Sequence, residues 1–131
     1  MKEIIFKQKI EALKFNNNGL IPCVVQDHNS KQVLMLAWGS KDTLLKSFLS
    51  GLATYWSRSR SEIWVKGETS GNIQEIKNIH IDCDKDTVLL GILQTGAACH
   101  TGRRSCFSWS SESTGEWEAV EPVEVDPKTL Y

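Results

Sequence analysis

This sequence of 131 residues lacks long apolar runs, a strong charge excess and internal repeats. No stretch has the length of a membrane-spanning helix, and charges in the first nine residues interrupt the apolar core that a signal peptide requires. We therefore expect a cytoplasmic protein that has no membrane partner. The formal net charge of -1 argues against a broadly basic protein that binds nucleic-acid polymers, so any anion site must be a local cluster.

Low-complexity tracts and long linkers are lacking too, whereas 40% of the residues are hydrophobic. Such a composition is typical of one globular domain with a real core, which we expect to span residues 1–131. The tail beyond Glu112 is polar, and we expect it to wrap the surface or a partner subunit.

Strand patterns dominate the rest of the chain. Two β-rich segments, 20–26 and 32–38, flank a polar stretch that suits a hairpin loop. One clear helix follows, since Ser40 can cap it, Gly51 can end it, and an apolar stripe lies between them. Further strands are predicted at 54–58, 62–66, 73–82 and 87–94. The fold class is therefore mainly β, α+β-like, with one main helix.

Only four cysteines are present, and in a reducing compartment metal binding or catalysis explains them better than disulfides. Cys23 lies in an apolar strand, where a buried core thiol is the better interpretation. Cys83, Cys99 and Cys106 together indicate a zinc site. Three thiolates without an obvious fourth ligand leave one zinc position open to water, and such an open position is typical of hydrolytic sites.

Three aspartates surround Cys83 in the run Asp82-Cys83-Asp84-Lys85-Asp86. In an extended chain the carboxylates would lie on one side and the thiol on the other, so one segment could serve two sites. Sharing one cation among all three carboxylates requires a bend or intervening waters, which a partly hydrated Mg2+ would suit. An acidic surface turn is the alternative, because such turns are common.

Residues next to these motifs suggest proton transfer and phosphate binding. His100 could act as a general acid or base, although a structural, hydrogen-bonded histidine is the alternative. Two Arg-containing stretches, 57–60 and 101–105, could bind phosphate, as could the polar loop 66–72. For each of these stretches a solvated turn is the alternative. Trp64 could stack on a purine, and its alternative is ordinary core packing. The candidate substrate-binding residues are Arg58, Ser59, Arg60, Trp64, Thr69, Ser70, Arg103 and Arg104.

From about Leu20 to Trp109 the sequence resembles the phosphoribosyl-AMP cyclohydrolase family of histidine biosynthesis. Four motifs carry the resemblance in order: Val33-Leu34-Met35-Leu36-Ala37, then Trp56-Ser57-Arg58-Ser59-Arg60 with Trp64 through Asn72, then Asp82-Cys83-Asp84-Lys85-Asp86, and finally Cys99-His100-Thr101-Gly102 through Cys106-Phe107. A departure follows the first motif, where Trp38-Gly39-Ser40 stands in place of an expected pattern closer to Tyr-Met-Asn.

The resemblance implies a monofunctional hydrolase that opens the N1–C6 bond in the adenine of N1-(5-phosphoribosyl)-AMP. It implies that water activated by zinc is the nucleophile and that magnesium assists. Asp82, Asp84 and Asp86 would bind Mg2+, and Cys83, Cys99 and Cys106 would bind one Zn2+ per subunit across a homodimer interface. The implied fold is an intertwined homodimer on a buckled, barrel-like mixed sheet. We expect no fused pyrophosphohydrolase domain, because few residues follow Trp109.

Two other functions remain open. A zinc nucleobase deaminase uses similar chemistry, but its catalytic Glu near a His ligand and its closely paired cysteines are not found here. A non-catalytic zinc-binding module is the second alternative, with Cys23 as the fourth thiolate.

Overall fold

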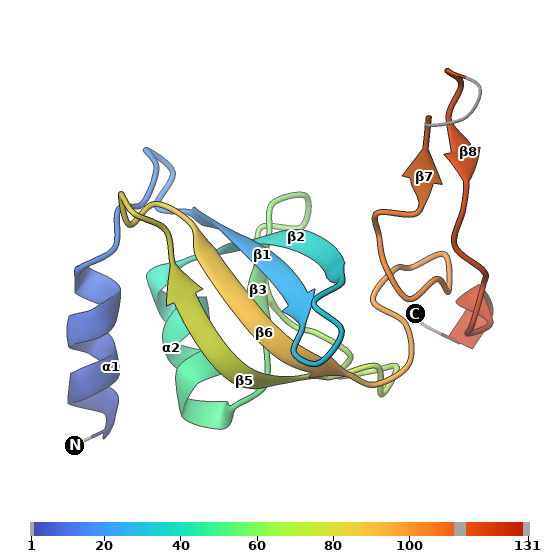
Figure 1. Ribbon diagram of the computed structural model, residues 1–131. Coiled ribbons are helices and arrows are strands. Elements are labelled where there is room, and N and C mark those ends of the chain that lie inside the picture. Colours follow the sequence, from blue (N-terminus) through green and yellow to red (C-terminus); the bar gives the residue numbers. More distant parts are fainter. Residues whose placement is uncertain (1, 112–114, 130–131) are drawn as a thin grey trace.

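A curled, six-stranded mixed sheet forms the centre of the computed structural model, which describes residues 2–111 and 115–129 (Figure 1). The strand order is β4-β3-β2-β1-β6-β5. These strands are β1 Ile21–Asp27, β2 Val33–Gly39, β3 Thr54–Ser57, β4 Glu62–Val65, β5 Gln74–Ile81 and β6 Val88–Gln94. The mainly β prediction is confirmed, and each predicted strand is present within one or two residues of its expected ends.

The sheet is mixed because β1 pairs with β2 on one side and β6 on the other. The β1–β2 hairpin is antiparallel, whereas β1 and β6 run parallel, with Cys23 opposite Val88. Alternate residues of β1 are fully buried, and Cys23 is among them. The prediction that Cys23 belongs to the core is therefore confirmed. Burial also raises the pKa of its thiol to about 12.

The predicted helix is α2, Lys41–Ser50. Ser40 caps it through a reciprocal pair of hydrogen bonds: the Thr43 amide donates to Ser40 Oγ, and the Ser40 amide donates to Thr43 Oγ1. Gly51 ends it in the left-handed conformation at φ 77°. Leu44 is buried in the core, where it lies beneath β2 at Gly39.

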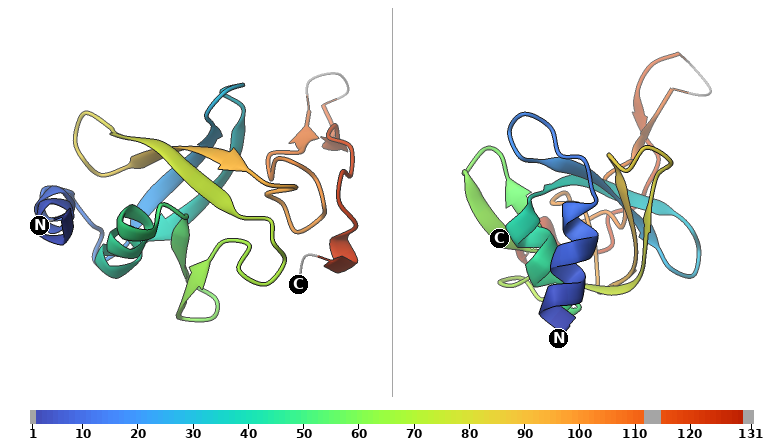
Figure 2. Two further views of the ribbon diagram at one scale, coloured as in Figure 1. Left: turned by 90° about the horizontal axis from the view of Figure 1, so that it is seen from below. Right: turned by 90° about the vertical axis from the view of Figure 1, so that its left-hand side faces the viewer.

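The expectation of one main helix is wrong, because a second helix, α1, spans Lys2–Glu11. Its apolar residues do not form a stripe, and Ile10 is its one buried residue, which explains why the sequence pattern did not reveal it. Figure 2 shows α1 beside α2. The Phe6 and Phe48 rings meet edge to face at 5.5 Å, and Lys41 pairs with Glu11 at 3.1 Å.

The C-terminal part lies beyond the end of the sheet (Figure 1). Strands β7 Trp109–Ser110 and β8 Glu118–Ala119 pair with each other, and a short helix, η1, follows at Pro127–Thr129. The Arg103–Val123 bridge fastens this arm to the segment that contains Cys99 and Cys106. Of the tail predicted beyond Glu112, residues 113–114 and 130–131 lie outside the described residues, and residues 115–129 form the rest of this arm. No helix in the described part of the chain is long and apolar enough to cross a membrane.

Candidate metal centres and substrate cleft

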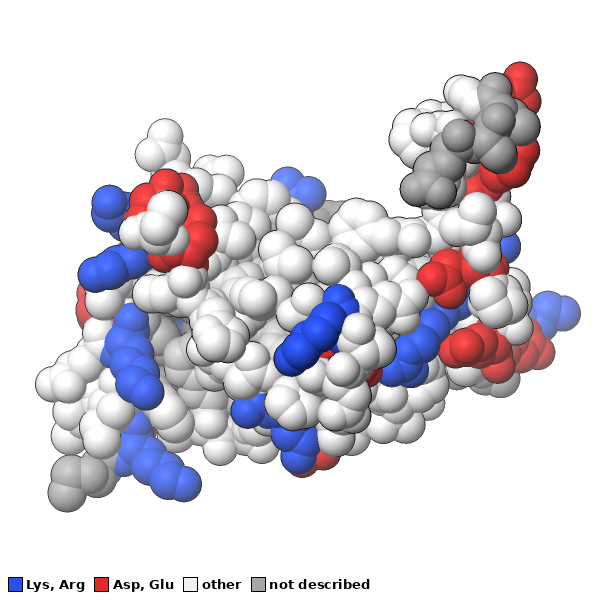
Figure 3. Space-filling model, viewed as in Figure 1, with Lys and Arg blue, Asp and Glu red and all other residues white. Residues whose placement is uncertain are grey.

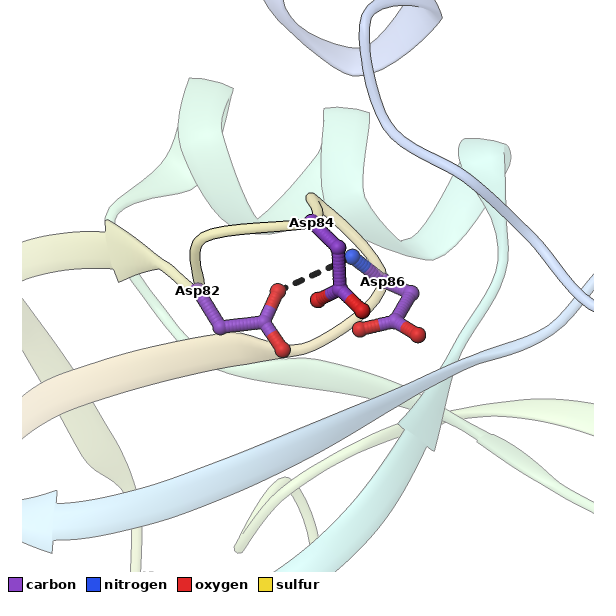
Figure 4. Close-up of side chains that lie close together, drawn as sticks. All are labelled: Asp82, Asp84 and Asp86. Carbon is purple, nitrogen blue, oxygen red and sulfur yellow. Dashed lines mark hydrogen bonds between the residues drawn. The ribbon is translucent and has the colours of Figure 1, made fainter.

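The three aspartates meet at the turn between β5 and β6. One oxygen from each of Asp82, Asp84 and Asp86 lies within 4.8 Å of the others, and all three residues are exposed (Figure 4). The segment is a turn rather than an extended chain: Asp82 Oδ1 accepts the amides of Asp86 at 3.0 Å and Thr87 at 3.2 Å, and Lys85 has φ 64°. The turn therefore provides the bend that one shared cation requires.

The electrostatics of this cluster favour a cation. Desolvation raises the pKa of Asp82, but hydrogen bonds from the Asp86 side chain and amide lower it, and the net result is a lowered pKa. Hydrogen bonds with Asp84 and Asp82 raise the pKa of Asp86, so Asp86 retains a proton more readily than Asp82 does. Acidic side chains gather over this turn at the upper left of the molecule (Figure 3). Carboxylate oxygens in this arrangement are suitable ligands for a hard divalent ion such as Mg2+.

Two of the predicted zinc ligands, Cys99 and Cys106, come together in the segment after β6. The amides of Ala98 and Cys99 donate to the carbonyls of Arg104 and Arg103, which folds this segment back on itself. The two thiols are close enough to form a hydrogen bond, and Cys99 Sγ lies 3.0 Å from Thr101 Oγ1. Burial and, less strongly, the adjacent Cys99 raise the pKa of Cys106 to about 12. A soft divalent ion would overcome this effect by binding the thiolates directly.

The third predicted ligand, Cys83, is exposed on the β5–β6 turn at the opposite end of β6. Strand β6 contains seven residues. At roughly 3.3 Å per residue it holds the two ends about 20 Å apart. Among the residues that the structure describes, the three cysteines do not form a cluster that could hold one ion within a single chain.

His100 lies at a cleft of about 340 Å3 beside the cysteine pair. The cleft is lined by Ser57, Ser59, Arg60, Trp64 and His100. Thr69 and Ser70 line a smaller hollow of about 90 Å3, which Arg60 and Trp64 also border. Five of the eight predicted substrate-binding residues and the predicted catalytic histidine thus surround two adjoining hollows, although they come from three separate segments.

The other three arginines contact other parts of the fold. The Arg58 guanidinium stacks on Trp38 at 4.7 Å from the ring centre, so the departure at Trp38-Gly39-Ser40 contributes a packing partner. Arg103 Nε donates to the Glu121 carbonyl at 2.9 Å. Arg104 pairs with the buried Asp27 at 2.7 Å. Each of the three thus makes a contact within the fold, and Arg58 also lines a separate cavity of about 400 Å3; their predicted role in substrate binding stays a prediction.

Lys66 lies near the site, and the sequence did not predict its contact there. It was predicted as one member of a polar loop, yet its side chain is buried and donates to the Ala98 carbonyl at 2.8 Å. Burial lowers the pKa of its ammonium group, and the charges of Cys106 and Cys99 oppose that shift. The contact with Ala98 spans 32 residues of sequence, so no local pattern could have revealed it.

Comparison with known proteins shows the family to which this chain belongs. The phosphoribosyl-AMP cyclohydrolase family model matches residues 35–108, which include Cys83, Cys99 and Cys106, the three aspartates of the β5–β6 turn and the residues that line the two hollows. The chain belongs to this family. The predicted resemblance is therefore confirmed, and the phosphoribosyl-AMP cyclohydrolases are hydrolases by name.

Curated relatives match over nearly the whole chain. A phosphoribosyl-AMP cyclohydrolase of Herminiimonas arsenicoxydans is 48% identical over 126 residues, which cover 93% of this chain and 94% of the relative. One of Magnetococcus marinus is 45% identical over 122 residues, which cover 93% and 94%. A third, of Rhodospirillum rubrum, is 48% identical over 120 residues, which cover 92% and 84%. The matched length far exceeds that of a shared metal motif.

Proposed function

We propose that this protein hydrolyses the N1–C6 bond in the adenine ring of N1-(5-phosphoribosyl)-AMP, the third step of histidine biosynthesis. The observation that carries this proposal is the cleft: His100, Arg60 and Trp64 meet beside the Cys99–Cys106 pair in a chain of the cyclohydrolase family. Water adds across the bond, so that its oxygen joins C6, which becomes a carboxamide carbon. The N1–C6 bond breaks, and N1 takes up a proton.

The proposed zinc site is formed by two chains. Cys99 and Cys106 supply two thiolates, and Cys83 of the partner subunit supplies the third, because in the same chain the length of β6, about 20 Å, separates the turn that carries Cys83 from this pair. A zinc ion with three protein ligands lowers the pKa of bound water to about 7. A two-fold symmetric homodimer would form two such sites, one per subunit.

The cleft residues transfer the proton and bind the substrate. His100 is exposed at the cleft beside Cys99, where it can hold the proton released by water and deliver it to N1. Trp64 offers a ring face to the purine, and Arg60 offers paired donors to a phosphate. Thr69 and Ser70 line the adjoining hollow, where they add neutral donors.

The aspartate turn fits the same assembly. Asp82 and Asp84 flank Cys83, so a turn that delivers Cys83 to the partner's cysteine pair also brings the carboxylates there. We propose that they hold Mg2+, which would neutralise substrate phosphate near the partner's cleft.

Mixing two inactive variants tests this function and the shared site together. Cys83→Ser and Cys99→Ser should each be inactive alone, since each destroys both sites of a homodimer. When equal amounts are unfolded together and refolded, half of the dimers should be mixed, and each mixed dimer has one intact site. Conversion of phosphoribosyl-AMP should recover to about a quarter of the wild-type rate.

The controls separate the two parts of the proposal. Cys23→Ala should remain active, because Cys23 is a core residue rather than a ligand. Wild-type protein that contains zinc and magnesium but does not convert phosphoribosyl-AMP would overturn the proposed function. An active wild type whose mixed variants stay inactive would overturn only the shared zinc site.

A further inference from the structure

Lys66 is a buried charged side chain to which the proposed reaction assigns no role. It follows β4 directly and is only 3% exposed. Its Nζ donates to the Ala98 carbonyl at 2.8 Å and lies 5.3 Å from the centre of the Trp64 ring. A buried lysine is costly to keep charged unless nearby groups compensate, so its surroundings need an explanation.

The groups that would compensate this charge are the two cysteines of the proposed zinc site, once a metal ion holds them as thiolates. The Lys66 ammonium interacts electrostatically with Cys106 and Cys99, and its hydrogen-bond acceptor, Ala98, immediately precedes Cys99. A zinc ion bound by three thiolates carries a net charge of minus one. An adjacent ammonium group neutralises that charge, and the effect is strong because the site is partly shielded from water.

The loop that begins with Lys66 holds the cysteine segment at a second point. Asn72 Oδ1 accepts the Ala97 amide at 3.1 Å. Gly67 allows the loop to close, because a Cβ there would lie 2.2 Å from the Asn72 backbone. Lys66 and Asn72 thus hold consecutive residues, Ala98 and Ala97, immediately before a zinc ligand.

We propose that Lys66 is a positioning residue of the zinc site: it fixes the backbone before Cys99 and neutralises the negative charge of the metal–thiolate group. This inference rests on the zinc site proposed above. Partners that orient metal ligands typically contribute 10- to 100-fold to metal affinity. Lys66 would act without contacting the substrate.

The test is zinc affinity, measured by competition with a chromogenic chelator on full-length protein whose aromatic circular dichroism shows that it is folded. Lys66→Met removes the donor and the charge, and Lys66→Arg keeps both. Lys41→Met is the matched control, since Lys41 also lies over a ring, that of Phe15 at 5.7 Å, but at the start of α2. Lys66→Met should raise the zinc dissociation constant by about 10- to 100-fold. Lys66→Arg should recover most of the affinity, and Lys41→Met should match the wild type.

Replacing zinc with cobalt gives a second measurement, the absorption of the metal–thiolate group. A purely structural role of Lys66 would leave this absorption unchanged. Folded Lys66→Met should show weaker or shifted thiolate-to-cobalt charge-transfer absorption than the wild type. If this variant does not fold, Lys66→Gln, which keeps an N–H donor without the charge, is measured in its place. Wild-type zinc affinity and cobalt absorption in either folded variant would overturn the inference. If Cys99→Ser binds zinc as tightly as the wild type does, that result would instead overturn the proposed zinc site on which this inference rests.

Discussion

Asp27 and Arg104 form a partly buried ion pair that stabilises the fold. Asp27 is buried and accepts the amides of Ser30 at 2.7 Å and Asn29 at 3.0 Å. Arg104 was predicted to bind phosphate, but it completes this cluster by pairing with Asp27. The sequence pattern singled out the Arg104 guanidinium but could not show its partner, because the Asp27 carboxylate is 77 residues away in the chain.

Asp27→Asn should destabilise the protein in a pH-dependent way. The Ser30 amide and, among weaker causes, the Arg104 guanidinium lower the pKa of Asp27, so its stabilising effect is present above the unfolded pKa and lost as the pH falls through the folded pKa. The expected loss at pH 7 is about 1 to 3 kcal/mol, because a hydrogen-bonded charge is removed. Urea unfolding at neutral and acidic pH measures it.

The difference in unfolding free energy between Asp27→Asn and the wild type should shrink in acid, where Asp27 is protonated in both the folded and the unfolded state. Glu75→Gln is the control, since Glu75 forms an exposed pair with Lys77 at 2.9 Å and should contribute little at any pH. A destabilisation that is equal at both pH values would contradict the assigned role of the Asp27 charge.

At the scale of elements, periodicity predicted well wherever one face is buried. The alternation in β1 and the capped stripe of α2 come directly from such burial. Helix α1 lacks a stripe because it touches the fold mainly through Phe6 and Ile10, so its sequence carries little of the signal. The aspartate cluster was predictable because its three carboxylates lie within five consecutive residues, whereas the Lys66 contact with Ala98 was not.

The loop 66–72 offers an element-scale test with an internal control. Gly67 and Gly71 both have positive φ, at 76° and 82°, but a Cβ at Gly67 would collide with Asn72, whereas a Cβ at Gly71 would meet nothing within 4 Å. Gly71→Ala should cost about 1 to 2 kcal/mol from backbone strain alone. Gly67→Ala should cost a further 1 to 3 kcal/mol from the collision.

Thermal and urea unfolding of the two glycine variants measure these costs. Gly67→Ala should also weaken zinc binding, since its loop holds the backbone before Cys99, and Gly71→Ala should do so much less. Equal unfolding free energies for the two variants would show that the loop does not close against Asn72 as described.

At the scale of the whole molecule, three aromatic residues near the C-terminal end of the sheet are largely exposed. Phe107, Trp109 and Trp117 are 59%, 59% and 72% exposed, and Phe107 directly follows the zinc-ligand candidate Cys106. Large apolar groups of this kind are typical of protein interfaces. The homodimer remains a prediction, as do the single-domain and cytoplasmic assignments, because one chain's sequence and structure do not reveal its partner.

Zinc removal should weaken the dimer, because the proposed metal links the two subunits. Sedimentation velocity should show a dimer in zinc and a shift toward monomer after chelation, and Cys83→Ser should resemble the chelated wild type. Trp109→Ser should weaken association in the presence of zinc as well, since it removes apolar contact area. A protein that stays monomeric while it binds zinc stoichiometrically would contradict the shared site.

The parallel pairing of β1 with β6 also sets the order in which the chain can fold during synthesis. Cys23 pairs with Val88, roughly 65 residues later. At translation rates of about 5 to 20 residues per second, β1 leaves the ribosome some 3 to 13 s before its neighbour is complete. During that time the first hairpin has an unpaired apolar edge that a chaperone can protect. The cysteine pair emerges later still, so the newly made chain would acquire zinc only after its sheet can close.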